Sequence, residues 1–259
     1  MDLSIIIVSW NTKDLLKKCL LSVYQNQGDL AVEIFVIDNN SNDKTVEMLR
    51  NEFKEVKLMA NSKNIGFAKA NNQALKLAQG EYILLLNPDT EILNGSLKKA
   101  VAFMKANAGC GALGAKLLWP DKSLQLSVRR FPTFLPIFLM FIKAPKLFKR
   151  IKSIERYLYA DFDYTRLQEV DQIMGAFMML PKKVVAKIGF LDERFFIWFE
   201  EVDLCQRIKK SGLQVIYNPD IEIIHYGGQS FAQEKIIKKQ WLFFQSAIRY
   251  FLKNGFFNH

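Results

Sequence analysis

Short apolar strand signals alternate with helix signals through the first hundred residues, and this alternation constrains the fold more than any other feature. The apolar runs are rich in β-branched residues, whereas the intervening segments carry apolar residues at helical spacing. The pattern predicts strands at 3–8, 33–37, 56–59 and 82–86, and helices at 13–25, from about 41, at 67–78 and at 96–105. Such βαβ units build a parallel sheet flanked by helices.

The second half of the chain is less regular. The same reading predicts strands at 110–118, 170–180, 215–217 and 222–225, a helix at 201–210 and a long amphipathic helix at 233–252. A chain of 259 residues is long enough for one large α/β domain with a real core. We therefore expect a single α/β domain.

Composition narrows the classes of partner and compartment. The net charge of +10 favours polyanionic partners, namely phosphorylated ligands, nucleic acid or an anionic membrane. Nucleic acid is not expected, because neither zinc-finger spacing nor an aromatic RNA-binding signature is present. Cys19, Cys110 and Cys205 are scattered without a CxxC pair, which indicates free thiols in a reducing compartment. With no signal-peptide pattern and no apolar run of about 20 residues, a cytoplasmic location is expected.

Three polar clusters each follow a predicted strand, at Ser9–Asn11, Asp38–Asn40 and Asn87–Asp89. Ligands of open parallel sheets bind beyond the carboxyl ends of the strands, so these clusters are expected to converge. Asp89 could hold a divalent cation that binds a diphosphate, or could belong to a simple Asn-Pro-Asp turn. Asp38 could accept a hydrogen bond from a pyrimidine base, or could cap a helix.

The second half of the chain contains two further candidates for a functional site, an acidic cluster and a histidine. Glu200, Glu201 and Asp203 follow an aromatic run, where a carboxyl group of raised pKa would suit a general base. The alternative is an acidic helix N-terminus that complements the helix dipole. His225 precedes two glycines that permit close backbone approach to a ligand, and it could complete a metal site with Asp89. A structural hydrogen bond is the alternative for this histidine.

The segment 129–156 combines basic and aromatic residues around a short apolar stretch. Such a segment can lie on an anionic membrane, giving a peripheral contact. It can equally be a solvated helical face whose apolar side packs inward.

Taken in order, these motifs resemble those of the family 2 nucleotide-sugar glycosyltransferases, and most closely the rhamnosyltransferase-like branch that builds bacterial cell-surface polysaccharides. The resemblance runs nearly end to end and is carried by Ile6–Asn11, Val36–Ser41, Asn64–Asn71, Leu86–Thr90, Gly175–Met179, Ile188–Glu193, Phe199–Arg207 and His225–Ser230. It implies a GT-A-like nucleotide-diphospho-sugar transferase fold, an inverting reaction, and Mg²⁺ or Mn²⁺ as cofactor.

The resemblance also implies a role for particular residues. The donor nucleotide would contact Ser9, Asn11, Asp38, Asn71 and Asn87, the last replacing the first Asp of the family's DxD-like motif. Asp89 and His225 would hold the metal. Glu201 would be the catalytic base, with Glu200 as the alternative, because the family often has a Glu-Asp pair here.

The implied partners are a dTDP- or UDP-linked sugar donor and a glycan or lipid-linked acceptor. Residues 1–118 would form the donor half and 119–259 the acceptor and catalytic half. A homodimer through the C-terminal helix, and a position at the inner face of the plasma membrane, are further expectations. A nucleotidyltransferase is disfavoured because no glycine follows the first strand before Gly28. A non-catalytic sugar- or membrane-binding module would leave Asp89, His225 and the acidic cluster without a task.

Overall fold

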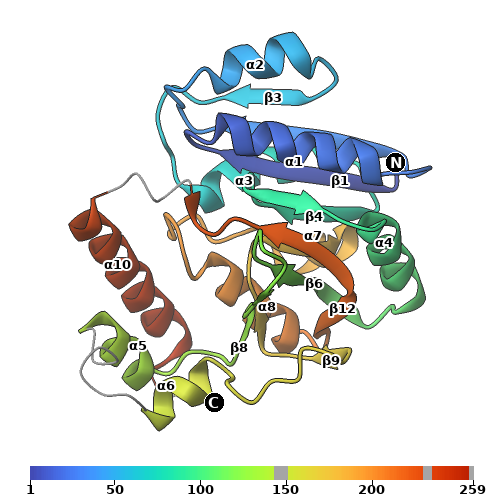
Figure 1. The fold of residues 1–259 in the computed structure, drawn as a ribbon. Coiled ribbons are helices and arrows are strands. Elements are labelled where there is room, and N and C mark those ends of the chain that lie inside the picture. Colours follow the sequence, from blue (N-terminus) through green and yellow to red (C-terminus); the bar gives the residue numbers. More distant parts are fainter. Residues whose placement is uncertain (143–150, 230–234, 257–259) are drawn as a thin grey trace.

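The computed structural model describes residues 1–142, 151–229 and 235–256. Its centre is a mixed sheet in the order β3-β2-β1-β4-β11-β6-β12-β5 (Figure 1). The strands on that path are β1 (Leu3–Ser9), β2 (Val32–Asp38), β3 (Lys57–Ala60), β4 (Tyr82–Leu86), β5 (Thr90–Ile92), β6 (Cys110–Leu118), β11 (Phe177–Pro181) and β12 (Gln214–His225). Shorter strands are β7 (Leu124–Gln125), β8 (Val128–Arg129), β9 (Gln168–Glu169) and β10 (Gln172–Ile173).

The first four strands pair in parallel, as the alternation of strands and helices predicted. Beyond β4 the sheet becomes mixed, because β11 runs antiparallel to both β4 and β6. β6 and β12 are parallel, and β5 closes the edge antiparallel to β12. The early strands are buried on both faces, which explains their nearly continuous apolar sequences.

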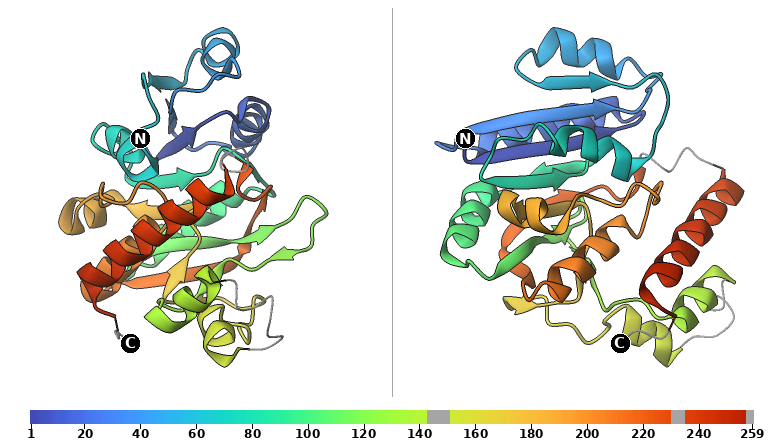
Figure 2. Two further views of the ribbon diagram at one scale, coloured as in Figure 1. Left: turned by 90° about the vertical axis from the view of Figure 1, so that its left-hand side faces the viewer. Right: turned by 180° about the vertical axis from the view of Figure 1, so that it is seen from behind.

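Helices cover both faces of the sheet, as the two further views of Figure 2 show. One core packs α1 (Lys13–Asn26), α2 (Thr45–Glu52) and α4 (Ser96–Ala106) against Leu3, Ile5 and Ile7. The other packs α3 (Phe67–Leu75), α7 (Lys182–Ile188) and α8 (Glu200–Lys210) against Ile6 and Val8. Side chains of β1 therefore alternate between the two cores, as the period of a strand requires.

A smaller third cluster lies beside the sheet and consists of helices from the less regular half. It joins α10 (Ile236–Asn254) to α5 (Phe134–Phe141), α6 (Lys152–Tyr157) and the segment before α8, through Ile137, Tyr157, Phe195, Phe199 and Tyr250. Figure 1 shows α10 standing apart from the sheet, with α5 and α6 at its lower end.

Two predicted elements differ from the structure. The strand predicted at 170–180 is broken into β10 and β11, which pair in different sheets. At the break, residues 174–176 line the cavity that is described below. Conversely, the short strands predicted at 215–217 and 222–225 form the single strand β12, whose pairing with β6 is irregular between Asn218 and Glu222.

Candidate functional site

The carboxyl ends of β1, β2 and β4 lie side by side at one edge of the sheet. Ser9 pairs in register with Asp38, and the N–H of Asn39 donates to the carbonyl of Ser9 at 2.8 Å. β4 lies on the other side of β1, so Asn87 to Asp89 follow at the same edge. The three polar clusters therefore converge there, because parallel strands end together.

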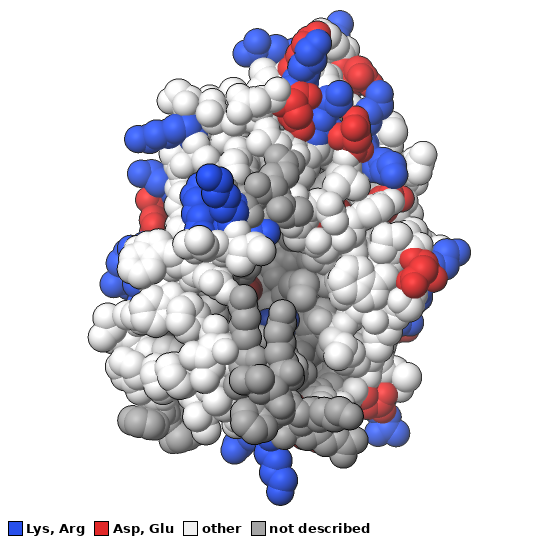
Figure 3. Space-filling model, turned by 60° about the vertical axis from the view of Figure 1, so that its left-hand side comes forward, with Lys and Arg blue, Asp and Glu red and all other residues white. Residues whose placement is uncertain are grey.

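A cavity of about 740 Å³ opens beside this edge. Figure 3 shows a hollow in the corresponding face, with both acidic and basic residues visible inside it. The walls come from both halves of the chain and consist of Val8, Trp10, Asn39, Asn64, Gly66, Phe67, Asn87, Pro88, Asp89, Trp119, Leu124, Gln125, Leu126, Arg129, Met174, Gly175, Ala176, Phe196, Ile197, Trp198, Glu200, Glu201, His225, Gly227, Gly228 and Lys239.

Asp89 and His225 form a buried pair in the cavity wall. The antiparallel pairing of β5 with β12 places His225 opposite Thr90, next to Asp89 in the chain. The His225 Nε2 atom lies 3.5 Å from Asp89 Oδ1 and makes no hydrogen bond to any described residue. Its Nδ1 atom lies 2.7 Å from Gln125 Oε1, which orients the ring. Nδ1 is therefore engaged by Gln125, and Nε2 faces the Asp89 carboxylate.

Asp89 is held in its ionised form despite burial. Burial acts to raise the pKa of its carboxyl group, but His225 and the backbone N–H of Gln229 outweigh this and lower it below the usual value. That N–H donates to Asp89 Oδ2 at 3.1 Å. The left-handed backbone of Gly227 and Gly228 carries the chain past this point. A Cβ at Gly227 would lie 2.7 Å from the Trp119 ring, so this position requires glycine.

Glu200 and Glu201 begin α8 and both line the cavity. Burial and the neighbouring Glu201 raise the pKa of Glu200 well above its ordinary value. Burial also raises the pKa of Glu201, but the Arg129 guanidinium opposes the rise. One oxygen of each carboxyl group, Oε2, has no hydrogen-bond partner within the described chain. Glu201 is the more accessible of the two, and the pKa of its carboxyl group is raised less than that of Glu200.

The two residues before this pair have an unusual backbone. Trp198 and Phe199 adopt positive φ angles of 63° and 70°, a conformation that bulky residues rarely take. Packing of α10 against them stabilises it, since the Phe243 ring lies 5.9 Å from that of Trp198 and 5.4 Å from that of Phe199. The Ser246 hydroxyl also donates to the Ile197 carbonyl at 2.8 Å. This turn directs the start of α8 toward the cavity.

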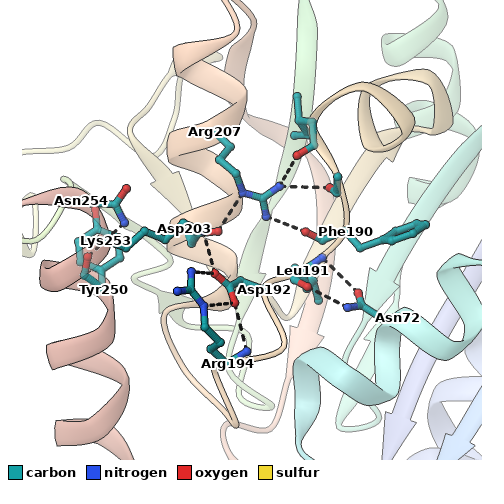
Figure 4. A network of polar contacts seen from close by, with 12 residues as sticks. Asn72, Phe190, Leu191, Asp192, Arg194, Asp203, Arg207, Tyr250, Lys253 and Asn254 are labelled. Carbon is teal, nitrogen blue, oxygen red and sulfur yellow. Dashed lines mark hydrogen bonds and ion pairs between the residues drawn. The ribbon is translucent and has the colours of Figure 1, made fainter.

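Asp203, the third carboxylate of the acidic cluster, does not line the cavity but lies in a structural network (Figure 4). It accepts a hydrogen bond from Arg207 Nε at 2.9 Å, and Lys253 Nζ lies 2.7 Å from its other oxygen as an ion pair. Lys253 also binds Asp192 at 2.8 Å. The network thus ties α10 and the loop before α8 to α8 itself. For Asp203 the dipole-complementing alternative fits better than a role in catalysis.

The residues expected to contact the nucleotide divide into two groups. Asn87 lines the cavity, whereas Ser9, Asn11, Asp38 and Asn71 lie behind or beside the lining residues. Asp38 is buried and accepts a hydrogen bond from the Ser41 N–H at 2.9 Å, while its Oδ1 has no partner in the described residues. The Asn11 side chain accepts from the Asn42 N–H at 2.7 Å and thereby links the ends of β1 and β2.

Ser9 and Asn71 make contacts that are local. The Ser9 hydroxyl lies 3.0 Å from that of Thr12. The Asn71 amide donates to the Phe67 carbonyl at 3.0 Å within α3. The polar groups that face the cavity at this edge instead include Trp10 and Asn39, which are the direct neighbours of the residues expected there.

Several cavity residues were not expected from the sequence. Arg129 was assigned to a basic surface segment, but the structure corrects this, because its pairing with Gln172 in β8 and β10 places it in the cavity wall. Gln125, Trp119 and Lys239 also line the cavity. The only sequence signal for Arg129 was the Arg129–Arg130 pair. Residues 143–150 of the basic segment lie outside the described residues.

Comparisons with known proteins identify the family and the fold. A family model described as glycosyl transferase family 2 matches residues 4–188. That range includes Asp38 and Asp89, while Glu200, Glu201 and His225 lie beyond it.

Among curated relatives, the chain is 26% identical to the rhamnosyltransferase WbbL of Escherichia coli over 97% of this chain and 90% of that one. It is 23% identical to the N-acetylglucosaminyl-diphospho-decaprenol L-rhamnosyltransferase of Mycobacterium tuberculosis over 78% of this chain and 69% of that protein.

Solved structures show the same fold. A Pyrobaculum calidifontis mannosyltransferase, solved with GDP-Man and Mn²⁺, superposes with a TM-score of 0.62 at 18% identity, covering 95% of this chain and 64% of that one. GalNAc-T7, solved with UDP, GalNAc and Mn²⁺, gives a TM-score of 0.64 at 15% identity over 98% and 56% of the two chains. The expected GT-A-like fold is thereby confirmed. With the family model covering more than half of its residues, the chain belongs to glycosyl transferase family 2.

Proposed function

We propose that this glycosyltransferase is an inverting, divalent-cation-dependent enzyme that transfers a sugar, with rhamnose favoured, from a dTDP- or UDP-linked donor to a hydroxyl group of a lipid-linked glycan. The observation that carries the proposal is that one cavity has the Asp89–His225 pair in its wall and the Glu200–Glu201 pair in the same lining. A leaving-group site and a base site therefore face the same space.

The Asp89–His225 pair fits a divalent cation by its donor set. An ionised carboxylate and an imidazole nitrogen that has no hydrogen-bond partner among the described residues lie 3.5 Å apart. No cluster of three or more His, Cys, Asp or Glu side chains suited to a metal occurs in the described ranges, so the remaining ligands would be diphosphate oxygens and water. A cation held there would offset the negative charge that grows on the departing nucleoside diphosphate.

Glu201 is the better candidate for the base because a base must be ionised before it can accept a proton. The nearby Arg129 favours the ionised form of Glu201, whereas Glu200 is more deeply buried and has the more strongly raised pKa. In the proposed step, the Glu201 carboxylate takes the proton of the acceptor hydroxyl. The hydroxyl oxygen attacks the anomeric carbon as the bond to the diphosphate oxygen breaks, which inverts the configuration at that carbon.

The donor nucleotide would lie along the edge formed by the ends of β1, β2 and β4. Asn87 and its neighbours Trp10 and Asn39 face the cavity there, while Ser9, Asn11, Asp38 and Asn71 lie immediately behind. Residues 1–118 would thus form the donor half. Residues 119–259 would supply Arg129, the two glutamates and the acceptor side.

The proposed sugar and acceptor come from the relatives. Two of them are named rhamnosyltransferases, and the name of one includes a diphospho-decaprenol acceptor. A lipid-linked acceptor would place the enzyme at the inner face of the plasma membrane, reached from the cytoplasm. The three buried free cysteines are compatible with a reducing compartment.

The first test is a thermal-shift panel of dTDP, UDP, GDP and CDP, each with and without Mn²⁺. A nucleotide at about a hundred times its dissociation constant stabilises the protein by roughly 2.7 kcal/mol, which gives a clear shift. A Mn²⁺-dependent shift with dTDP or UDP is expected. No shift with any nucleotide, in a folded sample, would overturn the proposed donor site and favour a non-catalytic binding module.

A further inference from the structure

The outward side of α10 carries an apolar stripe where a helix packed on a protein is usually polar. The stripe consists of Ile237, Trp241, Phe244, Ile248 and Leu252, which are spaced four, three, four and four residues apart and therefore share one face. Ile237, Trp241 and Leu252 are 81%, 58% and 72% exposed. These side chains are among the large apolar groups that water reaches most freely in the described chain.

The same helix has a second apolar stripe, which is the one that packs inward. Ala247, Tyr250 and Phe251 of that stripe are buried in the third core cluster. At 100° per residue the centres of the two stripes lie about 100° apart around the helix, and the stripes adjoin at Phe244 and Phe251. An apolar outer face beyond the packed one indicates a second apolar surrounding, because a solvent-facing side would be polar.

α5 packs beside α10 and adds further exposed apolar side chains. The Phe134 ring lies 5.9 Å from that of Phe251, and the Phe141 ring 5.0 Å from that of Phe244, so α5 packs along α10. Leu135 and Phe138 of α5, and Ile142 directly after it, are also exposed. We call the exposed side chains of α5 and the α10 stripe the outer surface.

The sequence of α10 and the sequence that follows Arg130 are both basic. The sequence of 235–256 contains four lysines and one arginine and no acidic residue. Lys253 and Arg249 also make contacts within the protein, to Asp203 and to the Arg194 carbonyl. The sequence of 132–154 likewise has basic residues and no Asp or Glu, and of these basic residues Lys152 lies within the described ranges. Apolar side chains with an exposed tryptophan, flanked by lysine and arginine, are the composition of helices that lie in the interface of an anionic bilayer.

We propose that the outer surface of α5 and α10 docks on an anionic phospholipid bilayer, with α10 lying along the interface. No helix of the described chain is long and apolar enough to cross a membrane. The proposed contact is peripheral, with the outer surface on the face of the bilayer. Apolar burial supplies binding energy, and the basic residues add attraction to the anionic headgroups.

The docking surface adjoins the cavity. Lys239 of α10 lines the cavity, and Phe243 of α10 packs on Trp198, which also lines it. Docking would hold the cavity beside the lipid surface, where a lipid-linked hydroxyl is presented. This part of the inference rests on the proposed function, whereas membrane binding itself does not require it.

The test measures co-sedimentation of the full chain with phosphatidylglycerol-containing vesicles and with phosphatidylcholine vesicles, without donor or acceptor. Wild type should bind the anionic vesicles. The triple variant Ile237→Ser, Trp241→Ser, Leu252→Ser should bind about tenfold or more weakly, since each lost apolar side chain removes burial. The matched control Leu77→Ser, Leu167→Ser changes residues that are 55% and 53% exposed elsewhere, and it should bind like wild type.

A second readout does not depend on the triple variant. Vesicles of brominated phosphatidylglycerol should quench tryptophan fluorescence of wild type, and the conservative variant Trp241→Phe should lose most of that quenching. The inference is overturned if wild type ignores anionic vesicles, if the triple variant and the control bind equally, or if phosphatidylcholine vesicles bind as well. A wild-type dimer that the triple variant dissociates, without vesicle binding, would assign the surface to a second copy. Transfer to a water-soluble acceptor tests the proposed function separately.

Discussion

Replacing Asp203 by asparagine should lower the free energy of unfolding by about 2–3 kcal/mol. The side chain is fully buried, and its carboxylate binds Arg207 at 2.9 Å and Lys253 at 2.7 Å. Asparagine keeps the shape but removes the charge from both contacts. Because those contacts connect α8 with α10, their loss should lower the stability of the whole domain.

The size of this stability loss depends on the interactions that Arg207 and Lys253 keep in the variant. Removing one partner of a buried pair costs about 3–5 kcal/mol when the other charge is left alone. Here the side chains of Arg207 and Lys253 are 21% and 28% exposed, so water relieves part of the loss. Arg207 also keeps the carbonyls of Ile188 and Phe190, and Lys253 keeps Asp192 (Figure 4). The cost should therefore lie below that range.

The assay is equilibrium unfolding in urea, followed by tryptophan fluorescence at neutral pH. The control Asp220→Asn changes an exposed carboxylate and should stay within about 0.5 kcal/mol of wild type. Below its unfolding range the Asp203→Asn variant should still transfer sugar, since Asp203 does not line the cavity. A loss under about 0.5 kcal/mol would refute the reasoning and mean that the network contributes little to stability.

Three further predictions concern the cavity. Asp89→Asn should abolish Mn²⁺-dependent nucleotide binding and lower kcat/KM by about 100-fold or more, measured by calorimetry and donor turnover, and near-normal values would contradict the metal assignment. Glu200→Gln should stabilise the protein relative to wild type increasingly as pH rises above the ordinary glutamate range. Because the pKa of Glu200 is raised in the folded state, the wild type loses stability as pH rises from the ordinary glutamate pKa toward the folded pKa. Urea unfolding of both proteins at two pH values in that range checks this. Arg129→Gln should raise the pKa of Glu201 and move the acidic limb of the kcat/KM profile to higher pH, whereas an unchanged limb would show that Arg129 does not act on Glu201.

The donor edge could be predicted from the sequence because parallel strands fix where their ends lie. Once the runs ending at Ser9, Asp38 and Leu86 are recognised as neighbouring strands, their following polar residues must meet. What periodicity does not settle is which residue of each cluster faces the cavity. Asn39 lines the cavity and Asp38 does not, because the chain leaves β2 and turns between these two residues.

The other wall could not be predicted, because non-local contacts position it. β7 and β8 are only two residues long, and neither has a period of its own. The Tyr164 hydroxyl accepts hydrogen bonds from the N–H groups of Ser127 and Val128, both at 3.0 Å, and helps to fix the chain beside Arg129. Likewise, the left-handed Trp198 and Phe199 depend on packing with α10 more than forty positions later, which local propensity cannot reveal.

The most direct test of the central claim is acceptor-dependent release of nucleoside diphosphate by Glu201→Gln. The proposed mechanism requires that this variant bind the donor nucleotide with Mn²⁺ as wild type does, yet turn over at least about 100-fold more slowly, since it loses only the proton acceptor. The matched Glu200→Gln variant should retain most activity. Near-normal turnover by Glu201→Gln, with or without a loss of turnover in Glu200→Gln, would contradict the assignment of the base.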